Sequence, residues 1–157
     1  VADTKKALKG VPMVFGVLNG VDSPATMMRR VVDCDAGGLL CWYEKGYNGR
    51  DLAELAKVTS LVSEFEEIMT KGERADSAVK VESGTSLENI AAYRKGDAFL
   101  ALILNEERKD ARVVVRLDAA KGPVSEFYTG GTFDGGGKIE LDVPAGETRA
   151  LFVKAKK

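Results

Sequence analysis

The stretch "NIAAYRKGDAFLALILNEERKDARVVVRL" (Asn89–Leu117) decides the fold, because its apolar residues recur at every second position, as in half-buried strands. Lys95-Gly96-Asp97 is typical of a tight hairpin turn, and the polar run 106–110 of a longer one. The stretch therefore predicts three antiparallel strands. The side chains expected to be buried here are Leu100, Leu102 and Leu104 on one face of a strand, and Val113, Val115 and Leu117 on one face of the next.

The rest of the tail continues with the same period. Three more predicted strands are "PVSEFYTG", "GKIELDV" and "TRALFVKA", separated by the turn-forming segments "GGTFDGGG" and "PAGE". From Val79 onward, six or seven short strands with frequent turns indicate an antiparallel β-sandwich. The glycine cluster 135–137 predicts a turn, because it lacks the following helix that a phosphate-binding loop needs.

The first 72 residues have a different pattern. Two runs, "VPMVFGVLN" (Val11–Asn19) and "GGLLCWY" (Gly37–Tyr43), are apolar on both faces, as in strands of a covered parallel sheet. Each run precedes an amphipathic helix, and the expected starts are Ser23-Pro24 and Asn48. The expected buried stripes are Met27, Met28, Val31 and Val32 in the first helix, and Leu52, Leu55, Val58, Val62, Phe65 and Met69 in the second, which ends at Gly72.

These two patterns predict an α+β fold. Residues 1–74 form a β-α-β-α segment, and residues 75–157 form the antiparallel β-sandwich. The junction at 71–78 is short and polar, so we expect the second helix to pack against the sandwich.

Composition narrows the classes of function. The chain has 157 residues, of which 45% are hydrophobic, and its net charge is -1, which argues against a nucleic-acid partner. No apolar run reaches the roughly 18 residues of a membrane span. The first ten residues lack the apolar core of a signal peptide, and a start at Val1 is consistent with a removed leader.

The residue types present also limit the chemistry. The chain has no histidine, which excludes Ser-His and Cys-His nucleophile pairs and imidazole metal ligands. We expect Cys34 and Cys41 to be small buried hydrophobes, with a disulfide as the alternative, because neither has a neighbour at CxxC spacing. No metal or cofactor is therefore expected.

The tail resembles the C-terminal β-sandwich of glycoside hydrolases that have a (β/α)8 barrel. The segments that carry this resemblance are "AYRKGDAFLALILNEERKDARVVVRL", "SEFYTGGTF" and "GKIELDVPAGETRALFV". They share a strand that ends in Asn105, a Tyr-Thr-Gly turn at 128–130, and a final strand after Pro-Ala-Gly at 144–146. The first 72 residues then resemble the seventh and eighth β/α units of such a barrel. The resemblance favours a secreted or periplasmic location.

In that family the active site lies at the carboxyl ends of the barrel strands. The resemblance implies that the residues placed there are Asn19, Gly20 and Asp22 after the seventh strand, and Trp42, Tyr43, Glu44 and Tyr47 after the eighth. Of these, Asn19, Trp42, Glu44 and Tyr47 are the candidate sugar-binding residues. Trp42 would stack on a sugar ring and Glu44 would bind hydroxyl groups. The structural alternatives are a Trp42 in the barrel core and a solvated Glu44.

The chain departs from the family in its catalytic residues. Glycosidases need two carboxyl groups about 5–10 Å apart. No glutamate lies near Asn19, and Asp22 is better explained as part of the helix cap beside Ser23. Both catalytic acids would then lie on earlier strands, and two β/α units cannot close a barrel. We therefore expect no catalytic residue in this chain and no glycosidase activity from it alone.

Two other functions compete with this one. The sandwich could be a carbohydrate-binding or protein-interaction module, although it contains no tryptophan. A small independent enzyme is the third hypothesis, and it lacks a phosphate loop, a histidine or a metal cluster to support it. If the first half is part of a barrel, its unpaired strand edge calls for a partner, either the rest of a longer polypeptide or a second copy of the chain.

Overall fold

The predicted helices and strands occur in the predicted order, and two short strands, Glu73–Arg74 and Thr132–Phe133, are additional. The computed structural model describes residues 15–18, 23–33, 39–42, 46–118 and 122–154, with the backbone alone for 15–18 and 39–42. The elements are β1 (Phe15–Leu18), α2 (Pro24–Asp33), β2 (Leu39–Trp42), α3 (Gly49–Lys71), β3 (Glu73–Arg74), β4 (Val79–Ser83), β5 (Ile90–Lys95), β6 (Ala98–Leu104), β7 (Ala111–Leu117), β8 (Val124–Glu126), β9 (Thr132–Phe133), β10 (Ile139–Val143) and β11 (Thr148–Val153), with short 3-10 turns at Asp76–Ala78 and Leu87–Asn89. The fold is α+β, as predicted.

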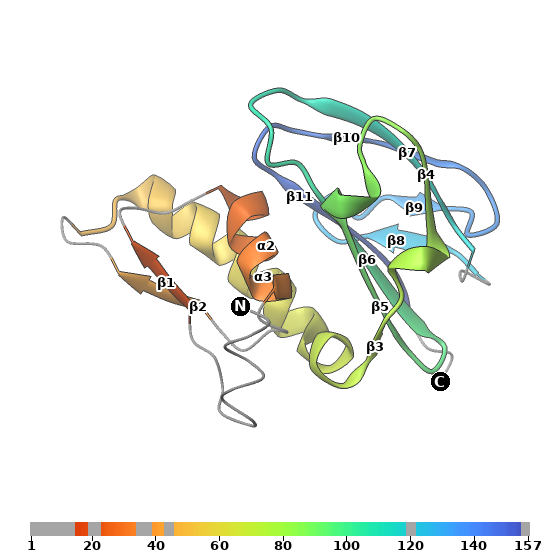
Figure 1. Ribbon diagram of the computed structural model, residues 1–157, viewed down its shortest axis with the longest axis horizontal. Coiled ribbons are helices and arrows are strands. Elements are labelled where there is room, and N and C mark those ends of the chain that lie inside the picture. The colour runs from red at the N-terminus through yellow and green to blue at the C-terminus, as the bar shows by residue number, and fades with distance from the viewer. Residues whose placement is uncertain (1–14, 19–22, 34–38, 43–45, 119–121, 155–157) are drawn as a thin grey trace.

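These elements form layers (Figure 1). β1 and β2 form a parallel pair, and α2 and α3 lie between this pair and a six-stranded sheet of order β3-β5-β6-β11-β8-β9. A three-stranded sheet of order β10-β7-β4 covers the other face of the six-stranded sheet. Every strand pairing in these two larger sheets is antiparallel, which confirms the sandwich.

β6 lies at the centre of the molecule. All its residues from Phe99 to Leu104 are buried, because the strand is covered on both faces. Leu100, Leu102 and Leu104 face the helices, whereas Phe99, Ala101 and Ile103 face the three-stranded sheet. The predicted burial is confirmed, and one strand serves two hydrophobic cores.

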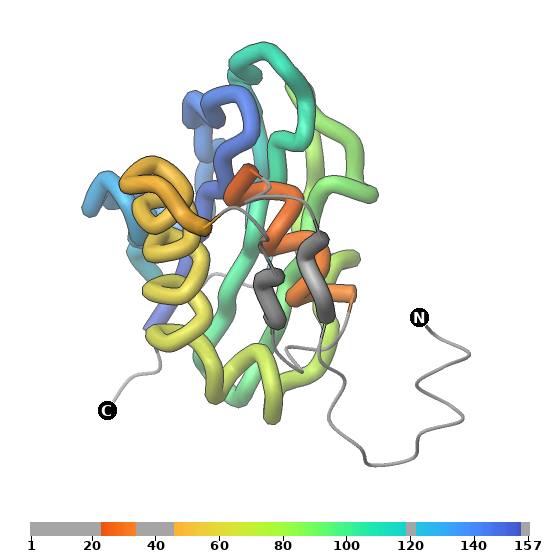
Figure 2. The backbone as a smooth tube through the Cα atoms, turned by 90° about the vertical axis from the view of Figure 1, so that its left-hand side faces the viewer, coloured from red at the N-terminus to blue at the C-terminus, as the bar shows by residue number. Residues whose placement is uncertain are grey.

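The helix α2 packs as the sequence predicts. Its four stripe residues, Met27, Met28, Val31 and Val32, are at most 3% exposed. Ser23 precedes the helix and its Oγ accepts a hydrogen bond of 3.3 Å from the Thr26 amide, as an N-cap does. Figure 2 shows α2 and α3 side by side against the strands of the sandwich.

The helix α3 agrees with the prediction at both ends and differs in its stripe. Asn48 and Asp51 form a capping box, and the amide of Gly72 donates to the Ile68 carbonyl at the other end. Leu52, expected to be buried, is 54% exposed. It lies one turn before Leu55, the first residue of α3 that reaches the core, and Leu61 and Ile68 are buried further along.

The junction contributes a strand that the sequence did not indicate. Glu73 and Arg74 pair with Arg94 and Tyr93 at the edge of the six-stranded sheet. The division at residue 74 into two domains stays a prediction. Cys41 lies in β2, and Cys34 lies outside the described residues. The expectation that both cysteines are small buried hydrophobes, with a disulfide as the alternative, therefore stays a prediction.

Candidate functional site

The candidate sugar-binding residues follow the two parallel strands. Leu18 and Trp42 are register partners and the last residues of β1 and β2, so both strands end at the same edge. Tyr47, just before the α3 cap, is 38% exposed. The residues that lie outside the described part of the chain are Asn19, Gly20, Asp22, Tyr43 and Glu44, and of Trp42 only the backbone is described. The structure therefore places the edge, and the roles of these side chains stay a prediction.

The start of α2 is held by the sandwich. The carbonyl of Gly146, in the turn between β10 and β11, accepts a hydrogen bond of 2.9 Å from the Ala25 amide. Amides in the first turn of a helix have no acceptor within the helix, so this contact satisfies one of them. The end of α2 that follows β1 is thus fixed by a turn far away in the sequence.

The first half of α3 is held by ionic and polar contacts. Lys57 Nζ lies 2.5 Å from Glu147 Oε1 and 3.1 Å from Glu54 Oε2. The hydrogen bond that Lys57 donates to Glu147 raises the pKa of Lys57 above its ordinary value, against the opposing effect of burial. The Tyr128 hydroxyl donates to the Lys57 carbonyl at 3.1 Å, and burial raises the pKa of that phenol.

A third anchor is Arg29 on α2. Its guanidinium donates to Glu106 Oε2 at 2.9 Å, to the Glu88 carbonyl at 2.6 Å and to Asn89 Oδ1 at 3.0 Å. These partners lie in two loops of the sandwich. The contacts fasten the helix to the sandwich and leave the guanidinium little freedom to bind a ligand.

The polar residues of the tail pattern have structural roles. Asn105 is 6% exposed, and its amide nitrogen donates to the carbonyls of Lys109, Val143 and Pro144. Glu126 is 2% exposed, and its Oε2 accepts from both the amide and the hydroxyl of Thr129 at 2.7 Å. A buried carboxylate is a candidate acid catalyst, but the hydrogen bonds from Thr129 give the Glu126 carboxylate a structural role in its turn.

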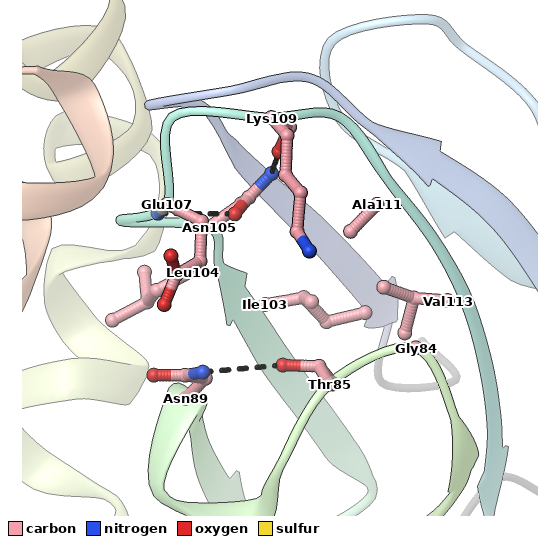
Figure 3. Close-up of a pocket in the computed structure, with 10 residues that line it drawn as sticks. All are labelled: Gly84, Thr85, Asn89, Ile103, Leu104, Asn105, Glu107, Lys109, Ala111 and Val113. Carbon is pink, nitrogen blue, oxygen red and sulfur yellow. Dashed lines mark hydrogen bonds between the residues drawn. The ribbon is translucent and has the colours of Figure 1, made fainter.

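A cavity of about 310 Å³ lies beside Asn105, between the loops at the end of the sandwich (Figure 3). Its lining residues are Gly84, Thr85, Asn89, Ile103, Leu104, Asn105, Glu107, Lys109, Ala111 and Val113. No aromatic side chain lines it, and Asn89 donates to Thr85 within the wall. The cavity therefore lacks the stacking surface that a sugar ring needs.

The described residues contain neither a metal-binding cluster nor a membrane-spanning helix. No cluster of three or more Cys, Asp or Glu side chains there is placed to hold a metal ion. None of the helices in the same part of the chain is long and apolar enough to cross a membrane.

Comparison with known proteins places the fold. No protein-family profile matches the chain, and no curated protein does. Solved structures that are similar include an α-amylase from Geobacillus thermoleovorans, with a TM-score of 0.56 and 13% identity over 99% of this chain and 42% of the other. An endoxylanase of glycoside hydrolase family 30 from Clostridium papyrosolvens gives a TM-score of 0.53 and 14% identity over 98% of this chain and 44% of the other. A family 30 xylanase from Clostridium acetobutylicum gives a TM-score of 0.51 and 19% identity over 95% of this chain and 44% of the other.

These likenesses concern the fold. The chain spans about two fifths of the length of these enzymes, and nearly all of it is matched. The chain therefore has the fold of a part of glycoside hydrolases, as the resemblance of the tail predicted. The anchors at Arg29 and Lys57 were missed from the sequence, because nothing in the pattern shows which loops meet each helix.

Proposed function

We propose that this chain is the C-terminal region of a glycoside hydrolase-like, carbohydrate-active protein. The observation that carries the proposal is the β1-α2-β2-α3 order packed on an antiparallel sandwich, which matches glycoside hydrolases over almost the whole chain and under half of theirs. In this proposal the ends of β1 and β2 form part of a sugar-binding edge, and the sandwich supports that edge.

Trp42 and Tyr47 are the aromatic residues that we propose for contact with sugar. Trp42 ends β2, and Tyr47 is exposed shortly after it. The face of an aromatic ring offers apolar surface to the C–H groups of a sugar ring. Asn19 and Glu44 complete the proposed site as hydrogen-bonding partners of sugar hydroxyl groups.

Exposed apolar side chains near this edge support the idea of a larger assembly. Among described residues, the large hydrophobic side chains that are exposed are Tyr47, Leu52 and Leu87. Tyr47 and Leu52 both lie at the start of α3, next to the proposed edge. We propose that further β/α units of a longer polypeptide, or a second copy of the chain, cover this surface.

The sugar-binding role is tested by fluorescence, because Trp42 is the sole tryptophan of the chain. Titration with xylo- and malto-oligosaccharides should shift Trp42 emission, and calorimetry should give the same dissociation constant. Tyr47→Ala should weaken binding, whereas Leu87→Ala, at an exposed position on the sandwich, should leave it unchanged. Binding that leaves Trp42 emission unmoved and is lost in Leu87→Ala would instead indicate a sandwich-based binding module.

Hydrolysis is a separate question. We expect the isolated chain to release no product from a chromogenic glycoside, because the paired carboxylates are proposed to lie on earlier strands. Turnover that survives repurification and disappears in Glu44→Gln would contradict this. A coding sequence upstream of Val1 with about 250 residues of barrel pattern would support the proposal.

A further inference from the structure

The turn between β10 and β11, Pro144–Glu147, contacts both helices. The Gly146 carbonyl accepts a hydrogen bond from Ala25 in the first turn of α2, and the Glu147 carboxylate binds Lys57 of α3. We call these four residues the docking turn. It contacts α2 at the end that follows β1, which is the end nearest the proposed sugar-binding edge.

Gly146 allows an unusually close approach. Its φ of +73° is one that residues with a side chain rarely adopt, and an added Cβ would lie 2.9 Å from Ser23 Cβ. Two independent features therefore require glycine here, the backbone conformation and the contact with the α2 cap. The distance between the turn and α2 is set by backbone atoms and is not adjustable by side-chain rotation.

The docking turn is also fixed from the side of the sandwich. Asn105 donates from its side chain to the carbonyls of Val143 and Pro144 at 2.8 and 3.1 Å, and from its backbone amide to the Glu147 carbonyl at 3.0 Å. Asp110 Oδ1 accepts from the Ala145 amide at 2.9 Å. A turn held in this way by the connection between β6 and β7 cannot follow α2 if the helix moves.

We propose that the docking turn is a positioning element for the sugar-binding edge. It fixes the start of α2. Because the connection from β1 to α2 is short, it also fixes the position at which β1 ends, where Leu18 is the register partner of Trp42. The inference rests on the proposed function for the importance of that edge. Gly146 contacts no sugar in this account and acts through α2.

The comparison of Gly146→Ala with Gly130→Ala tests the positioning role without any ligand. Gly130 also has a positive φ, +69°, but nothing lies within 4 Å of a Cβ added there. Both substitutions carry similar backbone strain, and only Gly146→Ala disturbs α2. Gly146→Ala should speed hydrogen exchange of the Ala25 amide about tenfold and shift Trp42 emission. Gly130→Ala should do neither.

A rescue variant keeps the test decisive if Gly146→Ala folds poorly. In the double variant Ser23→Gly with Gly146→Ala, the Cβ that would clash is removed, and glycine remains an acceptable N-cap residue. Exchange at Ala25 and Trp42 emission should return toward their original values. Ala25 exchange and Trp42 emission in Gly146→Ala equal to those in Gly130→Ala would overturn the positioning role.

Sugar titration of the same variants separates the two proposals. If the unmodified chain binds xylo- or malto-oligosaccharides, Gly146→Ala should raise the dissociation constant about tenfold over Gly130→Ala. Equal dissociation constants would overturn the positioning role. If the unmodified chain binds none of them, the sugar-binding proposal fails, while the ligand-free comparison still decides whether the turn positions the end of β1 beside Trp42.

Discussion

At the scale of single residues, β6 is almost continuously apolar because successive side chains are buried in two different cores. Leu102 is fully buried and faces the helices, and its neighbour Ile103 is buried against the three-stranded sheet. A strand with one solvated face would alternate apolar and polar residues, and β6 departs from the alternation expected of its segment because both its faces are covered. A residue of β6 therefore stabilises one of two cores according to its position in the alternation.

Leu102→Ala should lower the free energy of unfolding by about 2–5 kcal/mol, because it removes buried methyl groups and leaves a cavity. Chemical denaturation followed by circular dichroism measures the change. Leu87→Ala is the matched control, since Leu87 is 51% exposed, and it should change stability by about 0.5 kcal/mol or less. An equal effect of the two substitutions would show that the assigned register of β6 is wrong.

At the scale of elements, the contact between helices and sandwich has an apolar core and also includes two polar groups with raised pKa values. The pKa of Lys57 is raised chiefly by its hydrogen bond to Glu147, and that of Tyr128 by burial. Folding thus makes both groups hold their protons to higher pH than they do in the unfolded chain. The unfolded chain loses these protons first as pH rises, so the contribution to stability is present at neutral pH and is lost in alkali.

We therefore expect the denaturation midpoint to fall as pH rises above about 10, the region where unperturbed Tyr and Lys titrate. Tyr128→Phe should make this fall shallower, because it removes one of the two groups together with its hydrogen bond to Lys57. A slope that Tyr128→Phe leaves unchanged would contradict the role assigned to burial of this phenol.

Local patterns predicted the elements well, and long-range contacts were harder. Period two predicted the hairpin through Gly96, and the N-cap residue Asn48 predicted the start of α3. The sequence did not predict exposure of Leu52, because helical spacing shows which residues share a face and not how far the opposing sheet extends. The proposed site was predicted only through the family resemblance, since no distance between residues on β1 and β2 follows from periodicity.

At the scale of the whole molecule, the parallel pair β1-β2 is the smallest sheet of the described chain. β1 pairs with β2 and with no other described strand, so each has an unpaired edge there. Parallel strands are usually buried on both faces, and native proteins seldom leave such edges open. In the sandwich, by contrast, the six-stranded sheet is covered on one face by the helices and on the other by the three-stranded sheet.

We expect the first half of the chain to associate with another copy of itself, or with the rest of a longer polypeptide when that is present. Sedimentation at micromolar concentration should then give a mass above that of one chain.

Leu52→Glu, beside the proposed edge, should shift the equilibrium toward the monomer because it places a charge on the exposed apolar surface. Leu87→Glu is the control, because Leu87 is exposed to a similar extent, 51%, and lies in the 3-10 turn Leu87–Asn89 that precedes β5 of the sandwich. A strictly monomeric chain that unfolds in one cooperative transition would mean that the β-α-β-α segment is self-sufficient. The idea that it is the end of a barrel would then have to be abandoned.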